Sequence, residues 1–496
     1  MTSENADHEI VIVGAGFAGI GIGIALDKAG LTDYLIVEEG RGFGGTWYWN
    51  TYPGVAVDIP SFSYQFSFEK RPDWSRVYAP GSELRSYAED CAARYGLHAR
   101  TRFRTRVDAA TFDEESHVWR LDTTGGPITT RHLVDATGVL TQPRKPDIDG
   151  VDDFAGLTMH TSRWDHSQDL SGKRVAVIGT GASAAQLIPA VAGDVAHLTV
   201  FQRTPIWCLP KADAPIPAAA RLMLRRVPGM LGLSRLASQT LVELLFPLAA
   251  HFPNVLPFIG GFERRALDHM RREIHDPELR EKLIPRYALG CKRPAFHNEY
   301  LATYNRSNVT LETTPITRIE PRGVVTEDGT VHEIDVLVLA TGFKVFEPDN
   351  MPPFPVVGRA GTELGKWWAE HRHQAYEGVS VPGFPNYFLM CGPYSYNGSS
   401  YFNLVQTQAR HIVRCLRHAR SRKATLVEVK ARANDEYFAS MLRRGRHQIF
   451  WRDSCSSANS YYFDANGDVP LRPSPTLETM WRSERFPLRD YEFANR

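Results

Sequence analysis

Short runs of apolar and often β-branched residues recur along the chain, each closed by a glycine-rich turn or a polar residue. The first run is Glu9–Val13, and Tyr34–Val37 is the second, with the small and aliphatic stretch Ile20–Leu26 between them. Strands that are buried on both faces of a parallel sheet have this continuous apolar character. The pattern therefore predicts a strand, a helix and a second strand in this order.

A second unit of the same kind begins at Arg174–Ile178 and continues to His197–Phe201. Two further apolar runs, Leu133–Asp135 and Val336–Leu339, are each followed by Ala-Thr-Gly. Because one lies before the second unit and the other well after it, we interpret them as the points where the chain leaves and re-enters the first domain. We therefore expect an α/β fold with two doubly wound, Rossmann-like domains. The boundaries that we predict are 7–148 and 344–496 for the first, discontinuous domain and 149–343 for the second.

Two other stretches have a distinct pattern. Residues 212–279 are rich in Leu, Ala and Arg and predict a helical subdomain of the second domain, over the substrate entrance. Leu244–Phe262 carries no formal charge, but prolines at 247, 253 and 257 interrupt it. A membrane-spanning helix needs about 20 mostly apolar residues. We therefore expect short helical pieces and no integral membrane span, while peripheral membrane contact is left open. Gly323–Glu333 predicts a hairpin.

Composition narrows the classes of function. Lysine and arginine total 57 against 56 for aspartate and glutamate, so the formal net charge is +1 and gives no general reason to bind nucleic acid. The closest two of the six cysteines are 24 positions apart, which leaves no zinc spacing, no expected metal site and no local redox pair. No secretory signal is recognised, so reduced thiols in a cytoplasm are expected. The cysteines are Cys91, Cys208, Cys291, Cys391, Cys415 and Cys455.

The turn after the first predicted strand reads Gly14-Ala15-Gly16-Phe17-Ala18-Gly19. In this fingerprint the first glycine permits a tight turn, the second lets a pyrophosphate approach the backbone, and the third lets helix and strand pack closely. The phosphates then meet the N-terminus of the following helix. Glu38 ends the second strand, 19 positions beyond Gly19, where a carboxylate accepts hydrogen bonds from an adenosine ribose. The pattern predicts a dinucleotide site.

The second unit carries Gly179-Thr180-Gly181-Ala182-Ser183-Ala184 at the corresponding place. No carboxylate follows its second strand, where Arg203 and Thr204 stand instead. A cation at this position suits a 2′-phosphate, so the second site should prefer NADP to NAD. Two fingerprints of different polarity indicate two dinucleotides, one of which passes electrons to the other.

Between the two units the chain matches the pattern F-x-G-x-x-x-H-x-x-x-W-[P/D], with Phe154, Gly156, His160, Trp164 and Asp165 at its fixed positions. This motif resembles the signature of the class I Baeyer–Villiger monooxygenases, flavoproteins related to the flavin-containing monooxygenases. Residues 43–54, followed by Asp58, also look like the flavin-side loop of that family. The resemblance implies FAD in the first domain and NADPH in the second. It also implies that NADPH and O2 form a C4a-peroxyflavin that converts a small ketone to an ester or lactone.

The resemblance further implies roles for single residues. Arg293, in Gly290–Pro294, would be the catalytic cation, and Asp58 would pair with it. Lys292 would hold the 2′-phosphate together with Arg203 and Thr204. His160 would belong to a moving linker between the domains, with a conformational role. The residues implied for FAD are Gly14, Gly16, Phe17, Ala18, Gly19, Glu38, Gly45, Thr46, Trp47 and Asp58. Those implied for NADP are Gly179, Thr180, Gly181, Ala182, Ser183, Ala184, Arg203, Thr204 and Lys292.

Three alternatives stay open at this point. The same flavin intermediate could oxygenate sulfur or nitrogen, with a sulfide as substrate in place of the ketone. A flavin-dependent reductase or oxidase would release no oxygenated product, and its disulfide-reducing version is disfavoured because no pair of neighbouring cysteines is available. A redox sensor without catalytic activity would use the nucleotide folds only as a scaffold. Trp164-Asp165 and Lys292-Arg293 argue against the last two.

Overall fold

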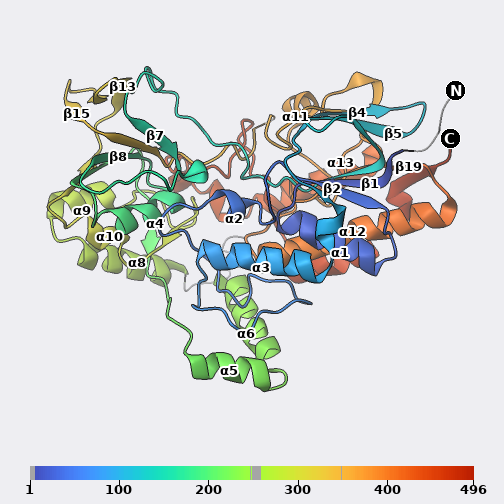
Figure 1. Ribbon diagram of the computed structural model, residues 1–496, viewed down its shortest axis with the longest axis horizontal. Coiled ribbons are helices and arrows are strands. Elements are labelled where there is room, and N and C mark those ends of the chain that lie inside the picture. Colours follow the sequence, from blue (N-terminus) through green and yellow to red (C-terminus); the bar gives the residue numbers. More distant parts are fainter. Residues whose placement is uncertain (1–5, 246, 248–258, 348) are drawn as a thin grey trace.

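The computed structural model describes residues 6–245, 247, 259–347 and 349–496, which form two lobes, each built around its own sheet (Figure 1). In the first lobe eight strands follow the order β17-β4-β5-β6-β1-β2-β3, with β18 also paired to β6. Their bounds are β1 His8–Val13, β2 Tyr34–Val37, β3 Thr101–Arg102, β4 Val107–Asp113, β5 Val118–Thr123, β6 Ile128–Asp135, β17 Val356–Val357 and β18 Tyr387–Leu389. The sheet thus takes strands from both ends of the chain.

Helices α1 (Phe17–Lys28) and α12 (Tyr401–Arg422) cover the parallel part of this sheet and lie side by side (Figure 1). Their close packing depends on Gly21, because a Cβ atom there would lie only 2.4 Å from Cγ1 of Val405. Phe17 and Phe402 meet in the same core, with ring centroids 4.6 Å apart. Burying such apolar side chains contributes about 1.5–3 kcal/mol each. The first fingerprint therefore opens onto a helix that is held rigidly between sheet and helix.

The second lobe holds five parallel strands in the order β12-β9-β8-β16-β7, all from the middle of the chain. A hairpin, Gly323–Glu333, belongs to an antiparallel sheet beside them, as the sequence predicted. The parallel strands in the main sheets of the two lobes confirm the predicted α/β class. The strands are β7 Leu157–His160, β8 Arg174–Ile178, β9 His197–Phe201, β12 Val309–Glu312, β13 Ile316–Glu320, β14 Gly323–Thr326, β15 Val331–Glu333 and β16 Val336–Leu339.

Helix α4 (Ala182–Val191) follows the second fingerprint and packs on the second sheet through Leu187 and Ile188. Helix α8 (Ile259–Glu273) adds Ala266 and Met270 to the same core. Helices α5 (Ala218–Arg226) and α6 (Met230–Leu245) instead project from the body below both lobes (Figure 1). Most of the predicted apolar segment 244–262 lies outside the described residues. Within the described ranges, each helix is too short or too polar to cross a membrane.

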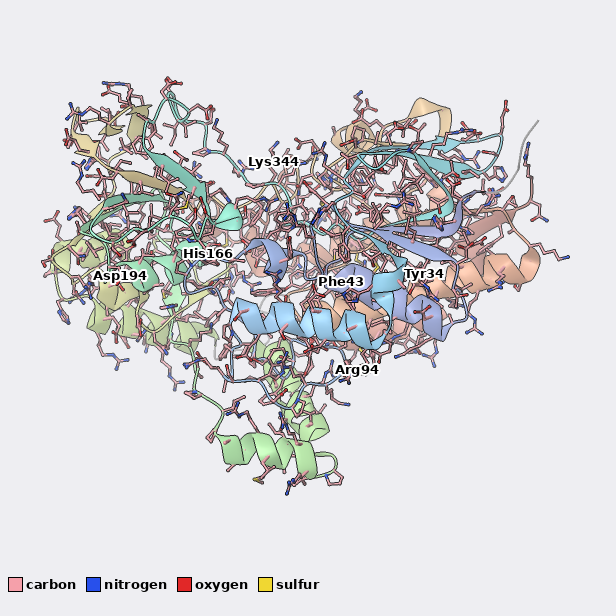
Figure 2. The ribbon with its side chains drawn as sticks, in the orientation of Figure 1. Tyr34, Phe43, Arg94, His166, Asp194 and Lys344 are labelled. Carbon is pink, nitrogen blue, oxygen red and sulfur yellow. A yellow bond between two sulfur atoms is a disulfide. The ribbon has the colours of Figure 1, made fainter. Side chains whose placement is uncertain are left out.

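The chain passes from the first lobe to the second between β6 and β7, and it returns after β16 near Lys344, which Figure 2 labels between the two sheets. The remaining elements are α2 Thr46–Trp49, α3 Gly81–Arg94, α9 Pro277–Leu283, α10 Tyr300–Thr303, α11 Leu364–His371, α13 Ala431–Gly445, α14 Thr476–Arg485, β10 Cys208–Leu209, β11 Ala295–Phe296, β19 Leu426–Val429 and β20 Tyr491–Ala494. Short 3-10 helices lie at Leu97–Arg100, Thr161–Arg163, Arg359–Gly361, Ile449–Trp451, Asp453–Cys455 and Leu488–Asp490.

Candidate active site

A cavity of about 1580 Å³ lies between the lobes and receives the carboxyl ends of strands from both sheets. Val13 and Ala136 border it from the first lobe, and Ile178 and Ala340 from the second. Ligands of open α/β sheets bind at this end of the strands. Pockets for one small ligand usually measure about 300–1,000 Å³, so this cavity has room for more than one cofactor and a substrate.

The first fingerprint forms a turn that only glycines allow. Gly14 has φ 106°, and a Cβ atom on Gly19 would lie 1.9 Å from the carbonyl oxygen of Gly14. Gly45, in the loop that the sequence assigned to the flavin, has φ 55° and would place a Cβ atom 2.8 Å from Cα of Gly16. Two stretches of bare backbone therefore face each other at the N-terminus of α1, where phosphate groups find unpaired N–H groups and a favourable dipole.

Glu38 lies at the end of β2 and is 7% exposed. Its carboxylate accepts hydrogen bonds from the backbone N–H of Ala15 at 2.7 Å and of Gly40 at 2.6 Å. Burial raises the pKa of Glu38, although these two bonds favour its charged form. A carboxylate offers about four lone-pair positions. Two of them stay available toward the cavity, which is what the two hydroxyls of a ribose require.

The turn of the second fingerprint has the same backbone conformation as the first, but the charged side chains beside it are cations. Gly179 has φ 112°, and a Cβ atom there would lie 2.5 Å from the carbonyl oxygen of Ala340. Arg203 and Lys292 both line the cavity at this turn. Burial, and then the positive charge of Arg203, lower the pKa of Lys292. Two cations that repel each other across a buried site favour an anion between them, which a 2′-phosphate would supply.

Arg293 and Asp58 come from different lobes and form an ion pair, with Nη2 and Oδ2 3.9 Å apart. Gln186 of α4 joins the same network across the lobes. Its Nε2 donates to Oδ1 of Asp58 at 3.2 Å and to the carbonyl oxygen of Ala56 at 2.9 Å. The hydroxyl of Tyr52 donates to the other end of the amide at 2.8 Å. One glutamine side chain therefore fixes the carboxylate that faces Arg293.

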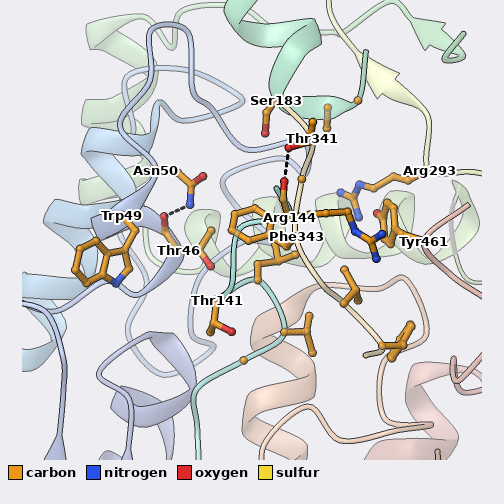
Figure 3. Close-up of a pocket in the computed structure, with 18 of the residues that line it drawn as sticks. Thr46, Trp49, Asn50, Thr141, Arg144, Ser183, Arg293, Thr341, Phe343 and Tyr461 are labelled. Carbon is orange, nitrogen blue, oxygen red and sulfur yellow. Dashed lines mark hydrogen bonds between the residues drawn. The ribbon is translucent and has the colours of Figure 1, made fainter. Parts of the chain in front are cut away.

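Aromatic hydroxyls surround the guanidinium group. Figure 3 shows Tyr461 beside Arg293, and Tyr396 and Tyr462 also line the cavity. Burial opposes the charge of Arg293, but the three tyrosines and Asp58 outweigh it, so its pKa stays well above the usual value. The side chain keeps 28% of its exposure. Because arginine remains protonated when it is desolvated, the cavity contains a permanent cation that is open to a ligand.

The expectation that the cysteines are reduced thiols is wrong for two of them. Cys291 and Cys455 form a disulfide although they are 164 positions apart, with a Cα–Cα distance of 5.0 Å. Both are buried, and neither lines the cavity. The bond ties the segment of Lys292 and Arg293 to the loop that carries Tyr461.

Spacing along the chain could not show the pair Cys291 and Cys455, because the fold alone brings these cysteines together. The absence of a cysteine pair therefore no longer argues against a disulfide reductase, but this pair does not open onto the dinucleotide turns.

The fixed positions of the signature motif do not line the cavity, although Arg163 between them does. Leu157–His160 is a strand of the second sheet, paired with β16, whereas the resemblance implied that His160 belongs to a linker. Nδ1 of His160 accepts a hydrogen bond from the N–H of Ser162 at 3.1 Å, and burial lowers the pKa of His160 to about 4. A Cβ atom on Gly156 would lie 2.6 Å from the carbonyl oxygen of Asp335. These contacts close the edge of the second sheet.

The predicted residues thus divide into two groups. The first group lines the cavity and comprises Gly14, Gly16, Phe17, Glu38, Gly45, Thr46, Trp47, Asp58, Gly179, Thr180, Gly181, Ala182, Ser183, Arg203, Thr204, Lys292 and Arg293. The second group lies outside the lining and comprises Ala18, Gly19, Phe154, Gly156, His160, Trp164, Asp165 and Ala184.

Sequence reasoning overlooked two further residues of the site. Gln186 is 5% exposed and is the only polar residue of α4 after Ser183 in its first turn, and this position was the signal that could have found it. Asn459 is the second. With its amide oriented to accept, its oxygen receives a hydrogen bond from Nε of Arg203 at 3.0 Å. No local pattern marks Asn459, because it reaches Arg203 only through the fold.

Two glycine turns, one beside a carboxylate and one beside two cations, define an oxidoreductase that is built for two dinucleotides. The family model of the pyridine nucleotide-disulphide oxidoreductases matches residues 11–216. A Baeyer-Villiger monooxygenase of Pseudomonas aeruginosa is 37% identical over 462 residues, which are 92% of this chain and 86% of that protein. The chain belongs to the Baeyer–Villiger monooxygenase family, which confirms the resemblance found in the sequence.

Two other comparisons cover nearly the whole chain. A phenazine N-monooxygenase of Lysobacter antibioticus is 32% identical over 492 residues, which are 91% of this chain and 90% of that protein. The crystal structure of OTEMO in complex with FAD and NADP has a TM-score of 0.85 and 28% identity, and it covers 99% of this chain and 100% of its own. The similarity therefore includes both lobes and the cavity between them.

Proposed function

We propose that the protein is an FAD-containing, NADPH- and O2-dependent monooxygenase that converts a small ketone to an ester or lactone. The observation that carries this proposal is the position of Arg293. Its side chain lines the cavity that both glycine turns border, and it pairs with Asp58. The similar OTEMO structure holds FAD and NADP, which supports these two cofactors. The cytoplasmic location expected from the sequence belongs to the same proposal.

The described residues fit both cofactors. FAD would lie on the turn at Gly14–Gly19, with Glu38 accepting hydrogen bonds from its ribose. NADPH would lie on the turn at Gly179–Ala184, with Arg203 and Lys292 donating to the 2′-phosphate. Bound FAD, once reduced by NADPH, would supply the activation of O2, of which one atom would enter beside the carbonyl carbon and the other would leave as water.

The chain itself contributes charge and position. The guanidinium of Arg293 stabilises the negative charge that develops on oxygen during attack on the carbonyl. Asp58 orients that guanidinium, and Gln186 holds Asp58. The tyrosines around Arg293 replace water with fixed dipoles, which act more strongly in a dry site. We infer that Arg293 is catalytic and that Asp58 and Gln186 position it.

The test uses the FAD-loaded full chain with NADPH, labelled O2 and a panel of ketones. An ester that contains one labelled oxygen supports the proposal. Arg293→Ala should retain reduction of the flavin by NADPH but lower ester formation by at least about 100-fold, the usual cost of removing one such donor. Arg286→Ala is the matched control, because Arg286 is exposed in the same stretch of chain and does not line the cavity. Ester formation at the normal rate by Arg293→Ala would show that the assignment is wrong.

A second candidate function is oxygenation of nitrogen or sulfur. The 32% identical phenazine N-monooxygenase is the observation that favours it. The same assay with a sulfide and an aromatic amine distinguishes the two. A sulfoxide or N-oxide without any ester would replace the first proposal by the second, and consumption of NADPH that yields only hydrogen peroxide would contradict both.

A further inference from the structure

Helix α6 has its polar face against the protein. Ser238 donates to the hydroxyl of Ser63 at 3.1 Å, and Gln239 donates to the hydroxyl of Ser399 at 3.0 Å. One turn further, Glu243 accepts a hydrogen bond from Thr476 at 2.9 Å. Gln239 and Glu243 are four residues apart and Ser238 is next to Gln239, so the three residues share one side of the helix. Hydrogen bonds hold this side to the first lobe.

The opposite side of α6 is apolar and exposed. Leu233 is 62% and Leu236 is 63% exposed, and Leu241 and Leu244 continue the stripe. A helix on the surface of a protein normally buries its apolar stripe and shows its polar side to water. Here the arrangement is reversed. The described residues expose fifteen large hydrophobic side chains, and eight of these belong to 222–245.

Helix α5 extends the same surface. Each of its residues remains at least partly exposed, including Leu222 and Met223, and Val227 follows directly. Figure 1 shows α5 and α6 together as a projection below both lobes, and Figure 2 shows the side chains that surround them. We call the exposed residues Leu222, Met223, Val227, Leu233, Leu236, Leu241, Leu244 and Leu245 the α5–α6 face.

The charge of this projection is one-sided. Residues 214–242 contain four arginines and no acidic residue, in a chain whose net charge is only +1. Arg235 is partly buried and donates to Asn403, and Arg225 pairs with Asp73. Arg221 and Arg226 form no ion pair within the described residues. The acidic Glu243 of α6 lies on the side that faces the protein, where it accepts hydrogen bonds from Ser399 and Thr476. The exposed side therefore combines apolar residues with arginines, which is the character of a helix that lies in the headgroup region of an anionic membrane.

We propose that the α5–α6 face docks on the surface of a bilayer that contains anionic phospholipids. The apolar residues enter the boundary between headgroups and acyl chains, and Arg221 and Arg226 bind the lipid phosphates. A second copy of this chain suits the face less well. Two identical faces would bring equal sets of arginines together, since a two-fold interface pairs each patch with itself. Anionic lipid supplies the opposite charge.

The test is sedimentation of the full, FAD-loaded chain with vesicles of phosphatidylglycerol and phosphatidylcholine. We expect binding that weakens in salt and is much weaker with vesicles of phosphatidylcholine alone. Leu233→Ser with Leu236→Ser should lower vesicle affinity by at least about tenfold per leucine. Arg221→Gln with Arg226→Gln should lower it by about fivefold per arginine on the anionic vesicles only.

The matched control is Leu477→Ser with Trp481→Ser, because both are highly exposed on another helix, α14. This variant should bind vesicles as the unchanged chain does. An equal loss of vesicle binding in the Leu233/Leu236 variant and in the control variant would overturn the proposal. Failure of the unchanged chain to bind anionic vesicles would also overturn it. The unchanged chain could instead self-associate with rising concentration and fail to bind vesicles. If Leu233→Ser with Leu236→Ser abolished that self-association, the α5–α6 face would be assigned to a second copy of the chain.

Discussion

Replacing Gln186 by methionine tests how the two lobes share one site. Methionine nearly matches the volume of glutamine but removes the amide that contacts Tyr52, Ala56 and Asp58. Tyr52 is 5% exposed and its hydroxyl would keep only its contact with Ser183, while the carbonyl oxygen of Ala56 would lose the amide donor. An unpaired buried polar group costs about 1–3 kcal/mol. The free energy of unfolding should fall by about that amount, measured by urea denaturation of the chain without cofactors.

The same replacement should affect catalysis separately. Asp58 would lose the contact that fixes it beside Arg293, and small displacements at a reacting centre cost about 100-fold in rate. Ester formed per NADPH consumed should therefore fall by about 10- to 100-fold, while flavin reduction stays within about twofold. Both are measured by product analysis and stopped-flow absorbance at equal FAD content.

Tyr52→Phe separates the two effects. It removes the hydroxyl and leaves the bond from Gln186 to Asp58 intact, so ester yield should be preserved. In the double variant the buried hydroxyl that lost the bond to Gln186 is absent, and part of the stability lost in Gln186→Met should return. An ester yield in Gln186→Met equal to that of the unchanged chain would refute the positioning role of Gln186.

Three further predictions concern the second dinucleotide and the disulfide. Arg203→Gln should weaken NADPH binding by about 10- to 100-fold and leave NADH binding unchanged, as measured by flavin reduction at varied cofactor concentration. An unchanged ratio of NADPH affinity to NADH affinity would contradict the role of Arg203. The pKa of Lys292 is lowered by burial and then by Arg203, so Lys292 loses its proton at a lower pH than a free lysine. NADPH affinity should therefore fall as pH rises toward about 10, with NADH affinity constant, and Lys292→Arg should remove this fall because arginine stays charged. Cys455→Ser should lower the free energy of unfolding by up to about 5 kcal/mol, the chain-entropy value for so long a loop, and a dithiol reductant should lower it in the unchanged chain but not in the variant.

Most of the framework could be predicted because it is local. The strand Tyr34–Val37 has the predicted bounds, since four consecutive apolar residues need a sheet that is covered on both faces. The turn at Gly14 follows from backbone geometry that only glycine adopts easily. The resemblance placed His160 in a linker, and no apolar run indicated a strand there, because β7 is a short edge strand that pairs only with β16 and has half-exposed positions.

What the sequence could not predict depends on residues that meet only after folding. The Cys291–Cys455 bond, the amide of Gln186 on Asp58 and the contact of Asn459 with Arg203 each join distant parts of the chain. Periodicity carries no information about such pairs, because each member is an isolated polar or small residue in its own segment.

Two of these distant contacts, Gln186 with Asp58 and Asn459 with Arg203, lie at the cavity between the lobes. Each dinucleotide turn belongs to a single lobe and is built by its own sheet and helix, whereas Asp58 and Arg293 come from opposite lobes. Gly54 marks how closely the lobes approach, since a Cβ atom there would lie 2.5 Å from the carbonyl oxygen of Gln186 and its φ is +83°. Alanine at Gly54 would therefore push the flavin-side loop away from α4 without touching either turn. Cofactor binding and oxygen insertion should thus respond differently to such a change, because each dinucleotide turn is built within one lobe, whereas the pairing of Asp58 with Arg293 depends on the contact between the lobes.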